Sequence, residues 1–174
     1  AEAAPPTLHD VPSFKYFPML YFLIALSSLS ADVTLPAIFN NHMVLQRDKP
    51  LAFWGWADAG EEVTVSTGAS KVAVKADNDG EWQARLPAMK QGGPHRIKIQ
   101  GKNSIELTDV LLGEVWICSG QSNMEWSMAA INNSGQEIEN AEYPNIRLFH
   151  VPKVPSAKPA LDVNAIWKPC TPQN

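Results

Sequence analysis

The stretch LAFWGWADAGEEVTVSTGASKVAVKADNDGEWQARL, residues 51–86, predicts a β fold. Apolar and polar residues alternate along 51–57, 61–67, 71–76 and 81–86. A period of two residues is typical of strands with one face in a core and the other in solvent. Turn-forming runs such as Asn78-Asp79-Gly80 separate the segments, as in antiparallel hairpins.

The same pattern continues downstream in HRIKIQ, residues 95–100, between two glycine-containing breaks. Short strands at such regular spacing predict an antiparallel β-sandwich-like domain over residues 31–109. The run ADNDGEW also invites comparison with a calcium-binding EF-hand loop. If Gly80 is taken as the sixth loop position, Lys75 and Leu86 fall first and twelfth, where carboxylates are required, so a hairpin is favoured.

The pattern changes at Val110. The run VLLGEVWICSG is almost continuously apolar up to Ile117, which predicts a buried strand covered on both faces. A helix is expected over 134–143, ended by Pro144, and a further strand over 145–151. Strand, turn, helix and strand in this order are the start of an α/β unit, so residues 110–174 are predicted to be a truncated α/β domain.

The N-terminal segment predicts export. In residues 14–31 a lysine precedes an apolar stretch, and small residues follow at the spacing that a signal peptidase recognises. Residues 1–30 are therefore predicted to be upstream residues and a signal peptide, with a buried helix as the alternative. The stretch is short for a membrane span, so no stable membrane insertion is expected. The expected location is secreted or extracytoplasmic, whether periplasmic, extracellular or lysosomal.

Composition excludes some functions. The chain has 174 residues, 45% of them hydrophobic, and a formal net charge of −4 without a basic run, which argues against nucleic acid as a partner. No Cys-x-x-Cys spacing suggests a metal or redox site. Export would allow Cys118 and Cys170 to pair, but buried free thiols are favoured because Cys118 lies in a predicted strand.

The turn Gly120-Gln121-Ser122-Asn123 is the candidate site of chemistry. A serine directly after a parallel strand would lie at the carboxyl edge of the sheet, where α/β proteins bind ligands. A base would have to activate its hydroxyl, and the following backbone amides could bind an oxyanion. The turn lacks the last glycine of the Gly-x-Ser-x-Gly elbow, so spacing alone favours an ordinary turn.

The block GEVWICSGQSNMEW, residues 113–126, resembles the first sequence block of the sialate O-acetylesterases and related carbohydrate acetylesterases of the SGNH (GDSL-like) hydrolase superfamily. Further similar blocks follow the family's order, and residues 33–172 are covered. These blocks are 35–65, 80–101, YPNIRLFHVP and WKPCTP. The resemblance implies a flavodoxin-like, three-layer α/β hydrolase domain that starts near residue 110. It also implies a serine esterase that removes acetyl groups from carbohydrates without a cofactor or metal.

The resemblance assigns the nucleophile to Ser122, whose backbone N–H would belong to the oxyanion hole, with Gly120, Gln121 and Asn123 around it. Gln121 stands where many superfamily members carry aspartate, and Ser119 is left as a turn residue. The family's downstream oxyanion-hole residues and its Asp-x-x-His pair have no match here. The histidines are expected to have surface or structural roles; they are His9, His42, His95 and His150. A serine without its base loses most of its catalytic advantage, so this chain is predicted to be inactive by itself.

Two other functions stay open: a noncatalytic β-sandwich that binds glycans, and a scaffold whose active site has decayed. The six tryptophans could also form sugar-stacking platforms. Trp82 and Trp116 are predicted to pack in the core, whereas Trp126 is a candidate pocket wall.

Overall fold

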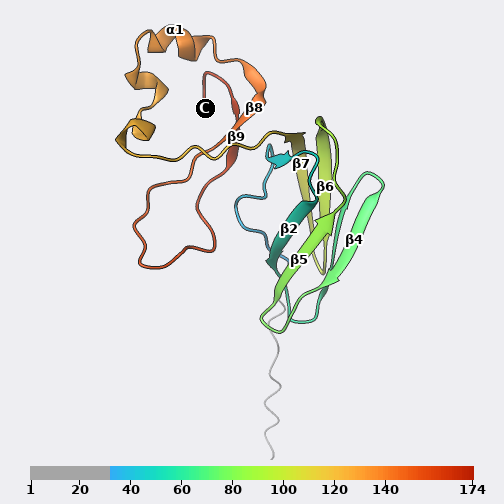
Figure 1. The fold of residues 1–174 in the computed structure, drawn as a ribbon. Helices are drawn as coiled ribbons and strands as arrows, with labels where there is room; N and C mark the ends of the chain where they lie inside the picture. The colour runs from blue at the N-terminus through green and yellow to red at the C-terminus, as the bar shows by residue number, and fades with distance from the viewer. Residues whose placement is uncertain (1–31) are drawn as a thin grey trace, which may run out of the picture.

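The computed structural model describes residues 32–174, and the predicted signal peptide lies outside them (Figure 1). We call residues 32–113 the β unit and residues 114–174 the C-terminal region. The β unit contains seven strands. They are β1 (Val44–Gln46), β2 (Leu51–Trp56), β3 (Glu62–Thr67), β4 (Ser70–Lys75), β5 (Glu81–Leu86), β6 (Gly92–Gln100) and β7 (Ser104–Gly113).

The strands of the β unit form two sheets. One has the order β1-β7-β6-β3-β4 and is mixed, because β1 runs parallel to β7 while the other neighbours are antiparallel. The second sheet is the antiparallel pair β2-β5. Each strand segment expected from alternation is present, with bounds that agree within a few residues. The β-rich architecture predicted for this half is therefore confirmed.

Both sheets contribute to one hydrophobic core. Phe53 of β2 and Ala84 of β5 are cross-strand partners and both are fully buried, as are Val65 of β3 and Ile99 of β6. Gly55 lies beside an isolated bridge between Thr34 and Trp56, and an added Cβ there would be 2.1 Å from the Thr34 carbonyl oxygen. The pattern of alternate buried residues thus gives the β unit its core, and a glycine lets the chain before β1 pack against β2.

The strand predicted over Val110–Ile117 is wrong in its extent. β7 starts at Ser104, crosses the predicted boundary between residues 109 and 110, and ends at Gly113. Its parallel partner β1 ends at the same level, where Gln46 faces Gly113. The apolar residues beyond lack a neighbouring strand in the described structure, and Ile117 is 93% exposed.

The C-terminal region has little regular structure. It contains two 3-10 helices, η1 (Ser122–Glu125) and η2 (Met128–Ala130), one short helix, α1 (Ser134–Glu139), and two strands, β8 (Tyr143–Phe149) and β9 (Trp167–Cys170). The predicted helix over 134–143 is present but ends earlier, and the predicted strand over 145–151 is found as β8.

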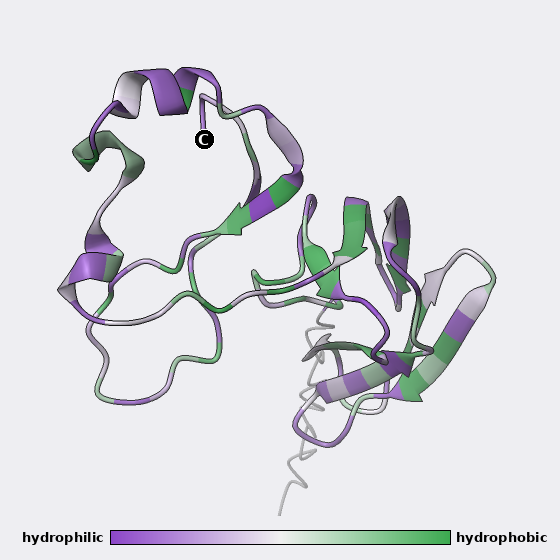
Figure 2. Ribbon diagram, turned by 45° about the horizontal axis from the view of Figure 1, so that its top comes forward, coloured by the Kyte–Doolittle hydropathy of each residue, from purple (hydrophilic) through white to green (hydrophobic). Residues whose placement is uncertain are grey.

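The described part of the C-terminal region does not form the predicted parallel α/β sheet. β8 pairs with β9 in antiparallel orientation, and no residue from 114 to 174 is buried. Figure 2 shows hydrophobic segments in this region as well as in the β unit, so apolar sequence is present without a core of its own. None of the helices within residues 32–174 has the length and apolar character needed to cross a membrane.

Candidate functional site

The predicted nucleophile is the first residue of a 3-10 turn. Ser122 begins η1, and the preceding Gln121 is extended, with φ −103° and ψ −155°. The Met124 N–H donates a 2.9 Å hydrogen bond to the Gln121 carbonyl oxygen, which closes the turn. The irregular residues 114–121 separate β7 from η1, so Ser122 does not directly follow a strand as expected.

Gly120 allows this turn to be tight. A Cβ at Gly120 would lie 2.6 Å from Cγ of Met124, because the methionine side chain folds back over the glycine. A side chain at this position would require the Met124 side chain to move. The local shape of the Gly-Gln-Ser-Asn run therefore depends on its glycine.

The turn displays its polar groups to solvent. Gly120, Gln121, Ser122 and Asn123 are all exposed. Within residues 32–174, the Ser122 hydroxyl makes no hydrogen bond, and neither the Ser122 nor the Asn123 N–H donates to a carbonyl outside η1. The first N–H groups of a helical turn lack partners in the turn itself, so both amides are open to an incoming acceptor.

No histidine of the described chain is joined to Ser122. His150 is exposed after the end of β8, and His95 lies in β6 with a buried Nε2 that has no described partner. His42 makes a 2.6 Å contact from Nδ1 to Oδ2 of Asp109. Within residues 32–174, the structure therefore brings no histidine side chain into contact with Ser122.

The His42–Asp109 pair has a structural partner in Arg147. Nη1 of Arg147 lies 2.6 Å from Oδ2 of Asp109, and Nη2 lies 3.2 Å from Oδ1. The Arg147 side chain is only 5% exposed, and its Nε donates to the Pro144 carbonyl oxygen at 2.7 Å. The Arg147 guanidinium, with a smaller contribution from His42, lowers the pKa of Asp109 below its ordinary value. This cluster holds β8 against the end of the β unit.

Sequence reasoning missed the cluster of Asp109 and Arg147. The two residues are 38 positions apart, and neither belongs to a recognisable local motif. His42 and Asp109 both have positive φ angles, 68° and 54°, which places their side chains in an orientation that alternation cannot predict. The expected structural role of His42 fits its position in this cluster.

The tryptophans and cysteines also differ in part from expectation. Trp82 is 3% exposed and packs in the core as predicted, whereas Trp116 is 83% exposed and Trp126 is 68% exposed. Both cysteines are free, but Cys118 is exposed and lies outside any strand, so the prediction that it is buried is wrong. The cause is the early end of β7 at Gly113.

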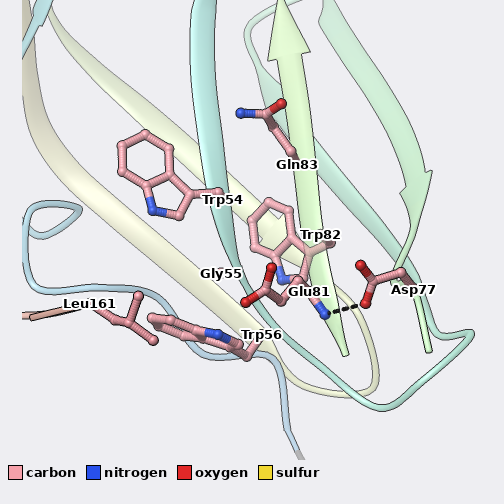
Figure 3. A pocket seen from close by; sticks show the side chains of 8 residues that line it. All are labelled: Trp54, Gly55, Trp56, Asp77, Glu81, Trp82, Gln83 and Leu161. Atoms are coloured by element: carbon pink, nitrogen blue, oxygen red, sulfur yellow. Dashed lines mark hydrogen bonds between the residues drawn. The ribbon is translucent and has the colours of Figure 1, made fainter. Parts of the chain in front are cut away.

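An open pocket lies over the β2-β5 sheet, and its lining includes no residue of the serine turn (Figure 3). Its volume is about 590 Å³. Trp54, Trp56, Glu81, Trp82 and Leu161 are among the residues that line it. Within residues 32–174, no three histidine, cysteine, aspartate or glutamate side chains are grouped so that they could hold a metal ion.

Known proteins with a similar sequence are acetylesterases. The chain is 32% identical to mouse sialate O-acetylesterase over 165 residues, which is 86% of the chain and 30% of the mouse protein. It is 36% identical to human sialate O-acetylesterase over 152 residues, which is 78% of the chain and 29% of the human protein. The chain thus spans about a third or less of the length of these relatives. No protein-family profile matches the chain.

A solved structure agrees with the sequence matches. The chain superposes on a carbohydrate acetylesterase from Xanthomonas citri, XAC1771, with a TM-score of 0.79 and 39% sequence identity. The match covers 82% of this chain and 34% of that protein. The sequence matches and the shared fold therefore place the chain in the class of the carbohydrate acetylesterases. Within that class, the chain belongs to the sialate O-acetylesterase family.

Proposed function

We propose that this chain is the serine-bearing part of an exported carbohydrate O-acetylesterase, with Ser122 as the nucleophile. The match to sialate O-acetylesterases over most of the chain is the observation that carries the proposal. The exposed Ser122 hydroxyl and the two open amides beside it are consistent with that role. The substrate class is an acetylated carbohydrate, and the sequence pattern of residues 14–31 supports export.

The reaction is an acyl transfer. The Ser122 oxygen attacks the acetyl carbonyl carbon while a base takes the hydroxyl proton, and the carbonyl oxygen becomes an oxyanion. The N–H groups of Ser122 and Asn123 are placed to donate to this oxyanion, with Gly120 and Gln121 shaping the turn. The sugar hydroxyl leaves with a proton, and water then releases acetate from the acyl-serine.

The C-terminal region is proposed to be the beginning of a flavodoxin-like α/β domain that packs against further residues of the full-length protein. Its exposed apolar side chains support this, because Trp116, Ile117 and Trp126 would be costly to leave in water. The β unit serves as the sandwich-like domain beside it. Without the base, the 174-residue chain by itself is expected to be inactive.

Replacement of serine in the full-length protein tests the proposal. Ser122→Ala is expected to reduce acetate release from acetylated oligosaccharides by about a thousandfold or more, because the acyl-enzyme cannot form. Ser119→Ala is the matched control in the same turn and is expected to stay within a few-fold of the unmodified protein. The 174-residue chain should show no Ser122-dependent hydrolysis of an aryl acetate.

Two results would contradict the proposal. Full activity of Ser122→Ala would remove the assignment of the nucleophile. Absence of esterase activity in the full-length protein, together with retained glycan binding, would favour the noncatalytic module. Export is tested separately, by following whether residues 1–31 direct a fused reporter out of the cytoplasm and are removed.

A further inference from the structure

We infer that the pocket over β2 and β5 is a second carbohydrate site, which binds a neutral saccharide apart from Ser122. The cross-strand pairs Trp54–Gln83 and Trp56–Glu81 flank the pair Gly55–Trp82. All six of these residues line the pocket, and Ser122 does not. The site therefore depends on the register of β2 and β5, which is also set by the core.

Two indole rings form the apolar part of the site. Trp54 is 39% exposed, and its ring meets that of Phe39 edge to face, with centroids 4.5 Å apart and an interplanar angle of 76°. Trp56 is partly exposed on the same strand (Figure 3). The face of an aromatic ring is electronegative, so it attracts the polarised C–H groups of a sugar ring. The contact with Phe39 holds the Trp54 ring in place before a ligand arrives.

The polar groups around the indoles suit hydroxyl groups. Within residues 32–174 no donor meets the Glu81 carboxylate, while Oδ1 of Asp77 accepts 2.9 Å bonds from the Asp79 and Glu81 N–H groups. Oδ2 of Asp77 has no hydrogen bond in the described structure, and the Gln83 amide has none either. These groups can accept hydrogen bonds from sugar hydroxyls at the edge of the rings.

Trp82 provides an independent indication of a missing partner. The residue is 3% exposed, and its Nε1 is buried with no hydrogen-bond acceptor among the described residues. Buried donors are almost always paired, so an orphaned indole N–H is an unusual feature of this residue. Because the nitrogen has almost no accessible surface, a ligand would accept a hydrogen bond from it only after a shift of the neighbouring side chains. Figure 3 shows this nitrogen on the side of the ring turned toward the part of the pocket with Glu81 and Trp56.

Charge selects among saccharides. Asp77 and Glu81 line the pocket, and its described lining contains no lysine, arginine or histidine. A sugar with a carboxylate would meet two like charges without a counter-ion, so a neutral sugar ring is favoured. This preference separates the site from one built to hold the carboxylate of an acidic sugar.

A loop from the C-terminal region closes one side of the site. Leu161 lines the pocket, and the next residue, Asp162, accepts hydrogen bonds from the N–H groups of Ala37 at 2.7 Å and Val163 at 2.8 Å. The Asp162 contact fixes the loop to the β unit near the chain before β1. The site thus combines a rigid sheet with a tethered loop.

Binding is tested on the 174-residue chain with xylohexaose, cellohexaose and mannohexaose as neutral probes. Saturation-transfer NMR and tryptophan fluorescence should detect at least one probe with a Kd at or below about 10 mM, as expected for a small, open site. The indole N–H resonance of Trp82, identified by its loss in Trp82→Phe, should shift on binding. Trp56→Ala should weaken binding by roughly tenfold or more.

Matched controls distinguish binding in this pocket from nonspecific binding. Trp116→Ala removes an equally aromatic but more exposed residue outside the pocket and should leave the Kd unchanged. Methyl β-glucuronide should bind more weakly than methyl β-glucoside, which carries a hydroxymethyl group in place of the carboxylate. Glu81→Gln should narrow this difference in Kd. If Trp56→Ala does not fold, as judged by its near-ultraviolet circular dichroism, Gln83→Ala serves as the second variant of the lining.

Three outcomes would overturn the inference. They are failure of all three oligosaccharides to bind at about 10 mM, equal loss of binding in Trp116→Ala and Trp56→Ala, and a preference for the glucuronide. Each readout is independent of acetate release. Loss of esterase activity in Ser122→Ala would therefore not affect saccharide binding in the pocket. Loss of saccharide binding would likewise not contradict the assignment of Ser122.

Discussion

The β unit and the C-terminal region differ in how their apolar residues are used. Every buried hydrophobic side chain in residues 32–174 lies between Val33 and Leu112. The C-terminal region is also rich in apolar residues, yet its exposed large side chains include Trp116, Ile117 and Leu161. A segment with hydrophobic sequence but no core of its own depends on contacts with other segments.

Several polar contacts join the two regions, and Trp167 also packs against the core of the β unit. Arg147 binds Asp109, and the Trp167 indole Nε1 donates to the Ile38 carbonyl oxygen at 2.8 Å. Asp162 accepts a hydrogen bond from the Ala37 N–H. Such tethers position the C-terminal region without giving it a stable interior. The comparison predicts that substitutions before Gly113 will change the stability of the chain much more than substitutions after it.

The largest difference in the free energy of unfolding is expected between substitutions of two aromatic residues. Phe53→Ala leaves a cavity in the core of the β unit and should lower the free energy of unfolding by about 3–5 kcal/mol. In the 174-residue chain, Trp116→Ala removes an 83% exposed ring and should change the free energy of unfolding by no more than about 0.5 kcal/mol. Chemical denaturation followed by circular dichroism measures both. Equal effects of the two substitutions would show that the C-terminal region is packed more tightly than described.

A smaller loss of stability is expected when the contact between Asp109 and Arg147 is removed. Asp109→Ala leaves the buried Arg147 guanidinium without its carboxylate and should cost about 2 kcal/mol, less than a fully buried pair because Asp109 is partly exposed. Hydrogen exchange should show faster opening of the β8 amides, with little change in β3. Asp109→Asn is the control for the backbone, because asparagine also tolerates the positive φ at this position. Unchanged exchange in β8 would mean that the other tethers are sufficient.

The same tether should make the attachment of β8 sensitive to acid. Arg147 lowers the pKa of Asp109 in the folded chain, so the stabilisation is fully present above the ordinary aspartate pKa of about 3.8. It should be lost as the pH falls through the lowered folded-state value, when the carboxylate takes up its proton. Hydrogen exchange or NMR shifts of β8 between about pH 5 and pH 2 would reveal this loss. In Asp109→Asn this part of the pH dependence should disappear.

The two regions also differ in how far the sequence predicts them. Alternation along 51–57 and 81–86 is a local property, and pairing of these strands buries the predicted face. The run after Val110 predicted a strand that continues to Ile117, but a strand also needs neighbours, and β1 and β7 both stop at the level of Gly113. Strand extent therefore depends on partners that composition does not reveal.

The residues of the two candidate sites also differ in how far the sequence predicts their role. Ser122 was identified from an ordered set of sequence blocks, and the structure places it in an exposed turn. The pocket over β2 and β5 was missed as a site because it requires the register of two strands and a loop more than 70 positions further along the chain. Trp82 was predicted to pack in the core, but its unpaired Nε1 is visible only in three dimensions.

The smallest effect is expected for the ion pair within the C-terminal region. Lys153 and Glu125 form a salt bridge whose side chains are 68% and 60% exposed, so solvent and salt screen it strongly. Glu125→Gln should leave the thermal unfolding midpoint unchanged within error at both low and high salt, although Glu125 lies only three residues after the predicted nucleophile. A clear, salt-dependent drop would mean that this pair holds η1 in place. The serine turn would then be positioned by the loop near Lys153 as well as by Gly120.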